Sequence, residues 1–304
     1  MKIFSGSAHP KLAEAAAVTF NKTLSPSEVV RFANSEIRVR VMGDVKDNVC
    51  AVIQPTSNPT DTHLVELMFF ADALRREGAN KIIGVIPYFG YARQNIQHRP
   101  GEAVSAHVVV KTLEGVGFDE IVSIDLHDEA TAGIFSIPFH HLSALPLLAQ
   151  KISAIITTGE PVIIVSPDQG GVERARQFSS HFFSTTAEVA IVEKKRNLDS
   201  LHVSKALDLY GDVDGKTVIL VDDIVTSGQT LINAASLCLD RGARRIIAAI
   251  THHDFAPGSA SKIQDSAVEK LFTTDTIPLQ EDSQIDKLEI VSVASLIAET
   301  LKKL

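Results

Sequence analysis

The stretch Thr217-Val-Ile-Leu-Val-Asp222-Asp223-Ile-Val-Thr226-Ser227-Gly228-Gln229-Thr230 decides the fold. Residues 217–221 are apolar or β-branched on successive positions, which is typical of a strand buried on both faces of a parallel sheet. Two carboxylates end this predicted strand, and a turn rich in hydroxyl groups leads into a helical pattern. The order of strand, turn and helix predicts an α/β fold.

Similar apolar runs recur along the chain and alternate with helical patterns. The runs span residues 48–53, 81–86, 120–124, 161–165, 189–192, 217–221 and 245–250. Apolar residues recur at helical spacing in 61–78, in 230–242 and in the closing segment 292–301, and Gly78 and Gly242 are placed to end the first two helices. The alternation predicts parallel strands joined by right-handed crossovers.

The alternation occurs twice, which predicts two domains. The first pass ends near Ser143, and a new apolar pattern begins at Ala144 without a Gly/Ser-rich linker between them. We expect two similar α/β domains, each with a mainly parallel sheet flanked by helices. The first comprises residues 1–143 together with the C-terminal helix 292–304, and the second comprises residues 144–291. A length of 304 residues suits two such domains.

Composition and charge exclude several classes of function. Hydrophobic residues make up 45% of the chain and charged residues 22%, the balance of a globular protein. A net charge of −8 repels nucleic acids and anionic membranes, and the absence of Trp leaves little for base stacking. The N-terminus lacks a signal-peptide core, and Cys50 and Cys238 both lie in apolar surroundings. We therefore expect a cytoplasmic protein without nucleic-acid or membrane partners.

The loop after the central strand predicts a site for a phosphorylated pentose. Ligands of open α/β sheets bind at the carboxyl ends of the strands. Backbone N–H groups and the hydroxyls of Thr226, Ser227 and Thr230 at a helix N-terminus favour a phosphate. Asp222 and Asp223 can accept hydrogen bonds from vicinal hydroxyls. The alternative is an ordinary helix cap after a strand.

The same stretch resembles the phosphoribosyl-pyrophosphate loop of two families, the type I phosphoribosyltransferases and the ribose-phosphate pyrophosphokinases. The resemblance implies a phosphoribosyltransferase-like fold. It also implies that the second domain binds ribose 5-phosphate through the loop residues, which are Asp222, Asp223, Thr226, Ser227, Gly228, Gln229 and Thr230.

Two further motifs favour the ribose-phosphate pyrophosphokinases and imply a magnesium site. The segment Ser166-Pro-Asp168-Gln-Gly-Gly resembles the family's pattern, in which the aspartate contributes to the metal and ribose site. The segment Ile124-Asp-Leu-His127 resembles its Asp-Leu-His motif. The resemblance implies that His127 and Asp168 help to hold Mg²⁺, an ion that usually takes few protein ligands besides phosphates and water. Without the resemblance, a single His is more often structural.

Two other segments imply contacts with ATP from the first domain. Tyr88–Gln94 resembles the family's nucleotide-contacting stretch, so Arg93 and Gln94 are implied to contact ATP. The segment Phe32-Ala-Asn34-Ser35-Glu36 resembles the family's Phe-x-Asp-Gly-Glu hairpin, which reaches the adenine of a neighbouring subunit. Phe32, Asn34 and Glu36 are therefore implied to bind ATP, although Asn34 and Ser35 depart from the pattern.

The basic segment Lys194-Lys195-Arg196 resembles the start of the family's mobile catalytic loop. Lys194 and Arg196 are implied to be catalytic, because two cations can offset the charge on a diphosphoryl group in transfer. The alternative is a solvated basic run.

Taken together, the resemblance implies a ribose-phosphate pyrophosphokinase. Such an enzyme transfers the β,γ-diphosphoryl group of MgATP to the C1 hydroxyl of ribose 5-phosphate, giving 5-phosphoribosyl 1-pyrophosphate and AMP. It also implies a homo-oligomer with the ATP site near a subunit interface. Two alternatives stay open: a phosphoribosyltransferase, and a non-catalytic synthase-like regulatory subunit.

Overall fold

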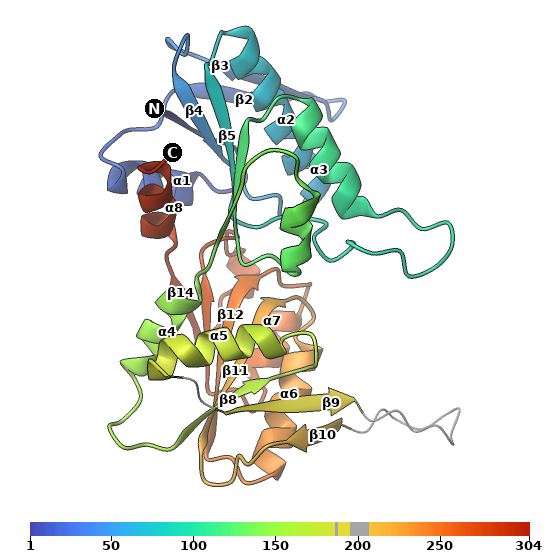
Figure 1. Cartoon of the computed structure of the whole chain (residues 1–304), viewed down its shortest axis with the longest axis vertical. Helices are drawn as coiled ribbons and strands as arrows, with labels where there is room; N and C mark the ends of the chain where they lie inside the picture. Colours follow the sequence, from blue (N-terminus) through green and yellow to red (C-terminus); the bar gives the residue numbers. More distant parts are fainter. Residues whose placement is uncertain (186–187, 195–206) are drawn as a thin grey trace. The chain divides into compact units, whose positions relative to one another are not determined.

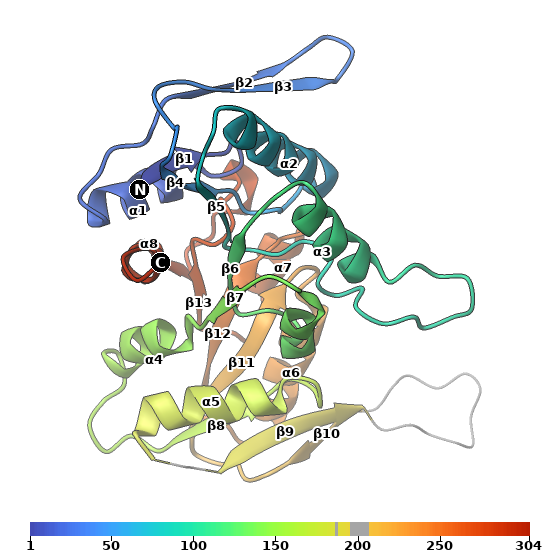
Figure 2. The same cartoon turned by 45° about the horizontal axis from the view of Figure 1, so that its top comes forward.

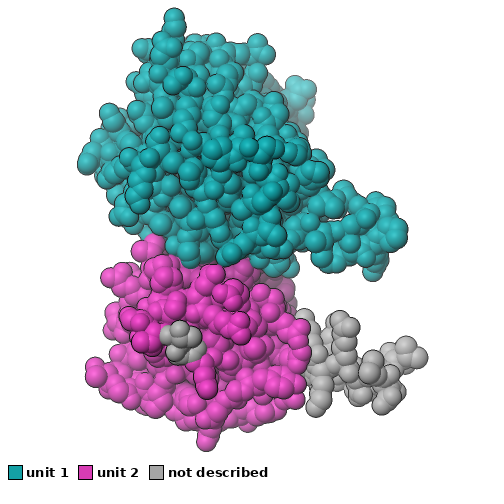
Figure 3. Space-filling view, in the orientation of Figure 1, with its two compact units in different colours: residues 1–143, 276–278, 292–304 teal, residues 144–275, 279–291 magenta. Residues whose placement is uncertain are grey.

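The computed structural model describes residues 1–185, 188–194 and 207–304, with only the backbone at positions 194 and 207. The described chain forms two compact units (Figure 3). Unit 1 contains residues 1–143, 276–278 and 292–304, and unit 2 contains residues 144–275 and 279–291. Both ends of the chain therefore belong to unit 1.

Unit 1 is built on a five-stranded sheet in the order β1-β4-β5-β6-β7, with parallel neighbours throughout (Figure 1). Its strands are β1 (Lys2–Ser5), β4 (Val49–Ile53), β5 (Lys81–Ile86), β6 (Glu120–Ile124) and β7 (Phe139–Leu142). A separate antiparallel hairpin consists of β2 (Ser27–Arg31) and β3 (Ile37–Val41). The helices are α1 (Pro10–Thr19), α2 (Thr60–Arg76), α3 (Ser105–Gly115), α8 (Ala294–Leu301) and the 3₁₀ turn η1 (Glu129–Ile134).

The core of unit 1 joins its central strands to helix α2. Leu67, Phe70 and Leu74 of α2 pack in one buried cluster with Cys50 of β4 and Ile82 of β5. This burial explains the helical spacing of apolar residues in the sequence. The helix ends where the sequence predicts, because the chain turns at Gly78 with φ +79°, a conformation that glycine adopts without steric cost.

The last helix, α8, lies beside α1 in both ribbon views (Figures 1 and 2). Ile297, Ala298 and Leu301 of α8 are buried. Lys302 Nζ donates a hydrogen bond, at 3.2 Å, to the backbone oxygen of Thr19, the last residue of α1. The C-terminal segment thus completes the packing of the N-terminal helix.

Unit 2 is built on a seven-stranded sheet in the order β10-β9-β8-β11-β12-β13-β14, which is parallel except for the β9–β10 pair. Its strands are β8 (Val162–Ser166), β9 (Val189–Lys194), β10 (Leu207–Tyr210), β11 (Thr217–Val225), β12 (Arg245–His253), β13 (Lys270–Thr274) and β14 (Leu288–Val291). Its helices are α4 (Leu145–Ser153), α5 (Val172–Phe183), α6 (Gln229–Asp240), α7 (Ser259–Gln264) and the 3₁₀ turn η2 (Glu281–Ser283).

The sheet of unit 2 is buried on both faces. Val218 and Leu220 of β11 pack in one core cluster with Ala234 of α6, whereas Ile219 and Val221 pack on the opposite face with helices α4 and α5. Successive residues of one strand therefore meet two different cores, as the unbroken apolar run predicts. The α/β fold class, with parallel sheets flanked by helices, is confirmed.

Strand β11 is longer than its sequence predicts. We expected the strand to end at Val221, but it continues to Val225. Its pairing with β8 stops at Leu220, whereas its pairing with the equally extended β12 continues from Asp222 opposite Ile250 to Val225 opposite His253. Pairing with β12 outweighs the low strand propensity of two acidic residues. Both carboxylates consequently lie on an extended strand end, past the last pairing with β8.

Candidate functional site

Two carboxylates on β11 share one guanidinium group. Nη1 of Arg174, in the first turn of α5, lies 3.3 Å from Asp222 Oδ1 and 3.1 Å from Asp223 Oδ1. The Arg174 side chain is 14% exposed and that of Asp223 only 4%, so the pairs are largely shielded from solvent. The backbone N–H of Asp223 also donates to Asp222 Oδ1, at 2.9 Å. These contacts fix the orientation of both carboxylates.

The carboxylate pair carries more negative charge than Arg174 neutralises. Burial raises the pKa of Asp222 well above its ordinary value, and the neighbouring Asp223 raises it further, whereas Arg174 lowers it. A hydroxyl donor or a cation that approaches this strand end would stabilise the ionised form. The site is therefore suited to binding a polyol, a metal ion or both.

The turn that carries Asp168 packs against this strand end. Asp168 Oδ1 accepts the backbone N–H of Gly171 at 3.1 Å, and Ser166 Oγ donates to the Asp168 carbonyl at 2.6 Å. A Cβ atom at Gly171 would lie 2.9 Å from Ser166 Oγ and 3.7 Å from Asp222 Oδ1. Glycine at position 171 therefore allows the turn to approach Asp222, and the structure brings Asp168, Asp222 and Asp223 to the same edge of the sheet.

The loop from β11 to α6 presents polar groups at a helix N-terminus. Gly228 caps α6 with φ +74°, and a Cβ there would lie 3.1 Å from the Ile263 side chain. Ser227 and Thr230 are exposed, and Ser227 Oγ accepts the N–H of Gln229 at 3.4 Å. The Gln229 side chain bonds to Asn233 within the helix. Exposed hydroxyls together with the α6 N-terminus form an arrangement suited to a phosphate.

In unit 1 the predicted residues Arg93, Gln94 and His127 lie on the loops after the adjacent strands β5 and β6. All three side chains are exposed. A hydrogen bond joins the two loops next to these residues: Asn95 Nδ2 donates to Asp128 Oδ2 at 2.5 Å. The structure thus brings the predicted nucleotide contacts and the predicted metal ligand of unit 1 together.

The side chain of His141 holds the loop that carries His127. Its Nε2 accepts the backbone N–H of Leu126 at 3.0 Å, and the N–H of Asp125 donates to the Leu142 carbonyl at 2.9 Å. His141 belongs to β7, the edge strand next to β6. His141 therefore acts as a structural support for this loop.

The remaining predicted ATP residues, Phe32, Asn34 and Glu36, lie at the tip of the β2–β3 hairpin. Asn34 Oδ1 accepts the N–H of Glu36 at 3.2 Å, and Ser35 has φ +74°. Phe32 is 43% exposed, with the Arg38 guanidinium carbon 5.7 Å from its ring centroid. The hairpin lies on the far side of α2 from the loop that leads from β5 into α3 (Figures 1 and 2), so one copy of unit 1 does not bring the two sets together.

The predicted catalytic pair lies at the limit of the described chain. Lys194 is the last residue of β9, and its side chain is outside the described residues. Arg196 lies wholly outside them. The predicted metal ligands belong to different units, His127 to unit 1 and Asp168 to unit 2. Within the described ranges, no group of three or more His, Cys, Asp or Glu side chains is placed to hold a metal.

Sequence reasoning missed Arg174 as a site residue. The only local signal was a basic residue in the first turn of a helix, where cations are unfavourable because of the helix dipole. A cation at that position points to a nearby negative partner, here Asp222 and Asp223, which are far away in the sequence.

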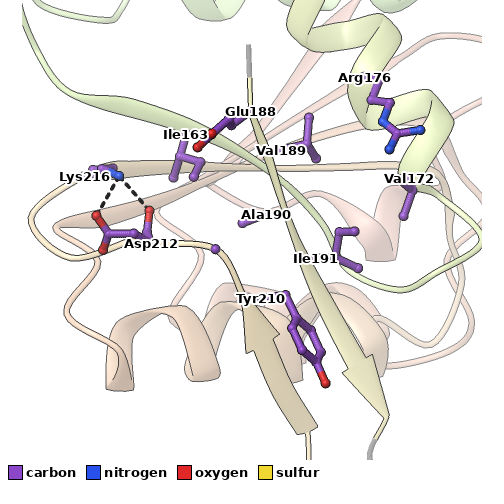
Figure 4. A pocket seen from close by; sticks show the side chains of 11 residues that line it. Ile163, Val172, Arg176, Glu188, Val189, Ala190, Ile191, Tyr210, Asp212 and Lys216 are labelled. Atoms are coloured by element: carbon purple, nitrogen blue, oxygen red, sulfur yellow. Dashed lines mark hydrogen bonds and ion pairs between the residues drawn. The ribbon is translucent and has the colours of Figure 1, made fainter.

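Two cavities lie elsewhere. One, of about 450 Å³, is lined by residues of strand β9 and the end of β10 in unit 2 (Figure 4). Lys216, also in its lining, donates a hydrogen bond of 2.9 Å to Asp212 Oδ2. The other, of about 400 Å³, lies between β3 and α2 in unit 1. Among the side chains that the structure describes, none of the predicted site residues lines either cavity.

No helix in the described part of the chain combines the length and the apolar character needed to cross a bilayer.

At the strand ends of the parallel sheets lie carboxylates, exposed hydroxyls and a helix N-terminus. This arrangement is typical of α/β enzymes that act on phosphorylated sugars or nucleotides. Residues 1–117 match the N-terminal domain of ribose phosphate pyrophosphokinase, and residues 162–304 match the phosphoribosyl synthetase-associated domain. The chain belongs to the ribose-phosphate pyrophosphokinase family, because relatives more than 30% identical to it match over nearly its whole length.

Among these relatives, the ribose-phosphate pyrophosphokinase of Thermosipho africanus is 38% identical over 99% of this chain and 93% of its own length. The ribose-phosphate pyrophosphokinase 1 of Streptococcus pyogenes is 37% identical with the same coverage. The crystal structure of phosphoribosylpyrophosphate synthetase from Mycobacterium smegmatis superposes with a TM-score of 0.92 at 32% identity, over 99% of this chain and 97% of that one. The similarity therefore extends over both units.

Proposed function

We propose that this chain transfers the β,γ-diphosphoryl group of MgATP to the C1 hydroxyl of ribose 5-phosphate. The observation that carries the proposal is the juxtaposition, at the end of β11, of a shielded carboxylate pair and an exposed, hydroxyl-rich helix N-terminus. Family membership agrees with it, because the relatives are named ribose-phosphate pyrophosphokinases.

Unit 2 binds the sugar phosphate in this proposal. Thr226, Ser227 and Thr230, with the backbone N–H groups at the start of α6, hold the 5-phosphate. Asp222 and Asp223 accept hydrogen bonds from the ribose hydroxyls. Arg174 orients both carboxylates through its contacts of 3.3 and 3.1 Å, and its charge opposes part of the rise that burial and Asp223 cause in the pKa of Asp222.

Unit 1 binds ATP. Arg93 suits the phosphates because its planar guanidinium group binds oxygens in pairs, and Gln94 follows on the same loop. His127 is the proposed Mg²⁺ ligand within unit 1, and Asp168 is the proposed Mg²⁺ ligand within unit 2. Each of these two side chains follows a strand and lies beside a proposed phosphate or sugar site. This position suits Mg²⁺, because the ion usually shares its coordination between a few protein ligands, phosphates and water. When bound, Mg²⁺ would neutralise charge on the ATP phosphates.

The chemical step needs no protein nucleophile. The C1 hydroxyl oxygen forms a bond to the β-phosphorus of ATP while the bond from that phosphorus to the α-phosphate oxygen breaks. AMP leaves, and the hydroxyl proton is released. Catalysis then consists of positioning and charge stabilisation. Lys194 and Arg196 supply positive charge to the diphosphoryl group as its negative charge develops.

The proposal includes a homo-oligomer, in which the hairpin tip of one chain reaches the ATP site of a neighbouring chain. Two observations support it: the ring of Phe32 is exposed, and α2 separates the hairpin from the loop that leads from β5 into α3. We also propose a cytoplasmic location, which suits a protein whose two cysteines are buried thiols without a disulfide.

The test is an assay of the purified protein with ATP, Mg²⁺ and ribose 5-phosphate. We expect AMP and 5-phosphoribosyl 1-pyrophosphate in equal amounts, and no AMP without the sugar. A phosphoribosyltransferase would instead release pyrophosphate from 5-phosphoribosyl 1-pyrophosphate and a base. A regulatory subunit would produce neither product.

A further inference from the structure

The loop that carries Arg93 and Gln94 rests on one buried threonine from another strand end. Thr56 follows β4 and is 2% exposed. Its Oγ1 accepts the backbone N–H of Gly90 at 2.7 Å and donates to the carbonyl of Tyr88 at 3.2 Å. Its own backbone N–H donates to the same Tyr88 carbonyl at 2.9 Å. Thr56 therefore provides hydrogen-bond partners for backbone groups on both sides of Phe89, the carbonyl of Tyr88 and the N–H of Gly90.

The contact is too close for any side chain at position 90. A Cβ there would lie 2.4 Å from the carbonyl oxygen of Thr56 and 2.7 Å from Cγ2 of Thr60. The first neighbour is backbone and cannot rotate away. The backbone of the loop thus lies too close to the segment after β4 to leave room for a Cβ atom. Glycine at position 90 therefore allows its N–H to reach Thr56 Oγ1.

Other contacts fix the rest of the loop relative to this point. Phe89 is buried, with its ring centroid 6.0 Å from that of Phe135. The N–H of Gln94 donates to the Tyr91 carbonyl at 2.9 Å, and Ser105 Oγ donates to Gln94 Oε1 at 2.7 Å. Arg93 is exposed and extends from a backbone whose first half is anchored by Thr56.

We infer that Thr56 is a positioning residue for ATP: its hydroxyl sets the backbone of residues 88–90 and thereby aims Arg93 and Gln94 at the nucleotide. This inference rests on the proposed function of these two residues. Loss of the hydroxyl leaves the buried N–H of Gly90 without its acceptor, and the loop relieves that cost by moving. A displacement of about 1 Å is enough to weaken binding through a side chain at its end.

The experiment compares Thr56→Val, which keeps the shape of the side chain but loses both hydrogen bonds, with Thr56→Ser, which keeps both. We expect Thr56→Val to raise the KM for ATP and the dissociation constant of MgATP roughly tenfold, with the KM for ribose 5-phosphate unchanged. Thr56→Ser should restore ATP affinity to within about twofold of the wild type.

Ser123→Ala serves as the matched control. Ser123 is equally buried in unit 1, and its Oγ donates to the carbonyl of Ile86 at the end of β5, at 2.8 Å, outside the loop itself. This variant should lose stability without a change in the affinity for ATP. An equal rise in the KM for ATP in Ser123→Ala, or a Thr56→Ser enzyme as weak as Thr56→Val, would overturn the inference.

Arg93→Ala separates this inference from the function on which it rests. If Arg93→Ala weakens ATP binding and Thr56→Val does not, the positioning role is refuted and the ATP site stands. If Arg93→Ala leaves ATP binding unchanged, the assignment of the loop to ATP is itself refuted.

Discussion

At the scale of single residues, the proposed sugar site contains a contact between one cation and two anions. Arg174 approaches Asp222 and Asp223 through the same nitrogen, inside a region with little access to water. Two adjacent carboxylates repel each other, and removal of a shielded partner costs more than the pair contributes when intact. The geometry of the pair therefore depends on Arg174.

We predict that Arg174→Gln raises the KM for ribose 5-phosphate about 10- to 100-fold, the range that loss of a charge-assisted hydrogen bond of ~1.5–3 kcal/mol implies. The KM for ATP should change little. Steady-state kinetics with each substrate varied in turn measures both. Arg176→Gln is the control, because the Arg176 side chain is 64% exposed and its pair with Glu173 is 3.5 Å long. Equal sugar KM values in the two variants would contradict the role of Arg174.

The predicted basic pair, Lys194 at the end of β9 and Arg196 beyond it in the sequence, is expected to act mainly on the rate. Lys194→Ala or Arg196→Ala should lower kcat about 100-fold or more, because loss of one group that stabilises developing charge typically costs ~10²–10³ in rate. The KM for ribose 5-phosphate should stay near its wild-type value. Rapid-quench measurement of AMP formation tests this, and a normal rate in both variants would rule out the catalytic assignment.

Candidate site residues can be predicted from the sequence when the residues next to them in the chain already indicate their position in the fold. Asp222 and Asp223 stand directly after an apolar run, so their place at the carboxyl edge of the sheet follows from the strand alone. Arg174 and Thr56 could not be assigned in this way. Arg174 meets its carboxylates across 48 and 49 positions, and Thr56 meets Gly90 across 34, so only the folded chain brings them together.

At the scale of elements, the sequence predicts helix ends better than strand ends. Gly242 turns the chain with φ +90° directly after α6, as its position suggests, because glycine has little cost in that conformation. The end of β11 could not be read in the same way. It depends on the length of β12, its partner in the sheet, and strand propensity is a weak guide where pairing decides.

The opposite ends of these strands are tied together by Glu160. Its carboxylate accepts hydrogen bonds from Thr217 Oγ1 at the start of β11, from Arg245 Nε at the start of β12 at 3.0 Å, and from the backbone N–H of Thr157 at 3.0 Å. These partners lower the pKa of Glu160 from 4.5 to about 2, with the Thr217 bond as the largest cause. The folded state therefore binds a proton at this carboxyl group less readily than the unfolded state does.

We predict a pH dependence of stability from this group. A lowered pKa in the folded state stabilises the fold fully above about pH 4.5, and the stabilisation is lost as the pH falls towards 2. Glu160→Gln should therefore have a lower Tm than the wild type at pH 7, and the gap should narrow between pH 4.5 and 2. Glu269→Gln is the control, since Glu269 also pairs with Arg245 but is half exposed. A Tm gap for Glu160→Gln that is independent of pH would contradict the prediction.

At the scale of the whole molecule, unit 1 is built from segments that are far apart in the sequence. The chain leaves unit 1 after Ser143, returns for residues 276–278, and ends in unit 1 with α8 beside α1. Each unit holds one buried cysteine, Cys50 in unit 1 and Cys238 in unit 2. Burial raises the pKa of Cys50 to about 11 and that of Cys238 to about 12, so neither forms the reactive thiolate in the native state.

The two thiols can report on the two units separately. We predict that deletion of residues 292–304 makes Cys50 react with a thiol reagent at least about tenfold faster, because unit 1 loses a helix that packs on α1 and opens more often. Cys238 should stay protected. Peptide mapping after brief labelling at pH 8 distinguishes the two cysteines, with the full chain as control. Equal labelling of both cysteines would show that the units do not open independently.

The return of α8 to unit 1 has a consequence for biosynthesis. A ribosome releases the chain from its N-terminus, and domains generally fold as units once their residues have emerged. Unit 2 is complete at residue 291, whereas unit 1 lacks its last helix until residue 301. The unit that begins the chain is therefore the later one to be finished, and the nascent protein completes unit 2 before the last helix of unit 1 has been synthesised.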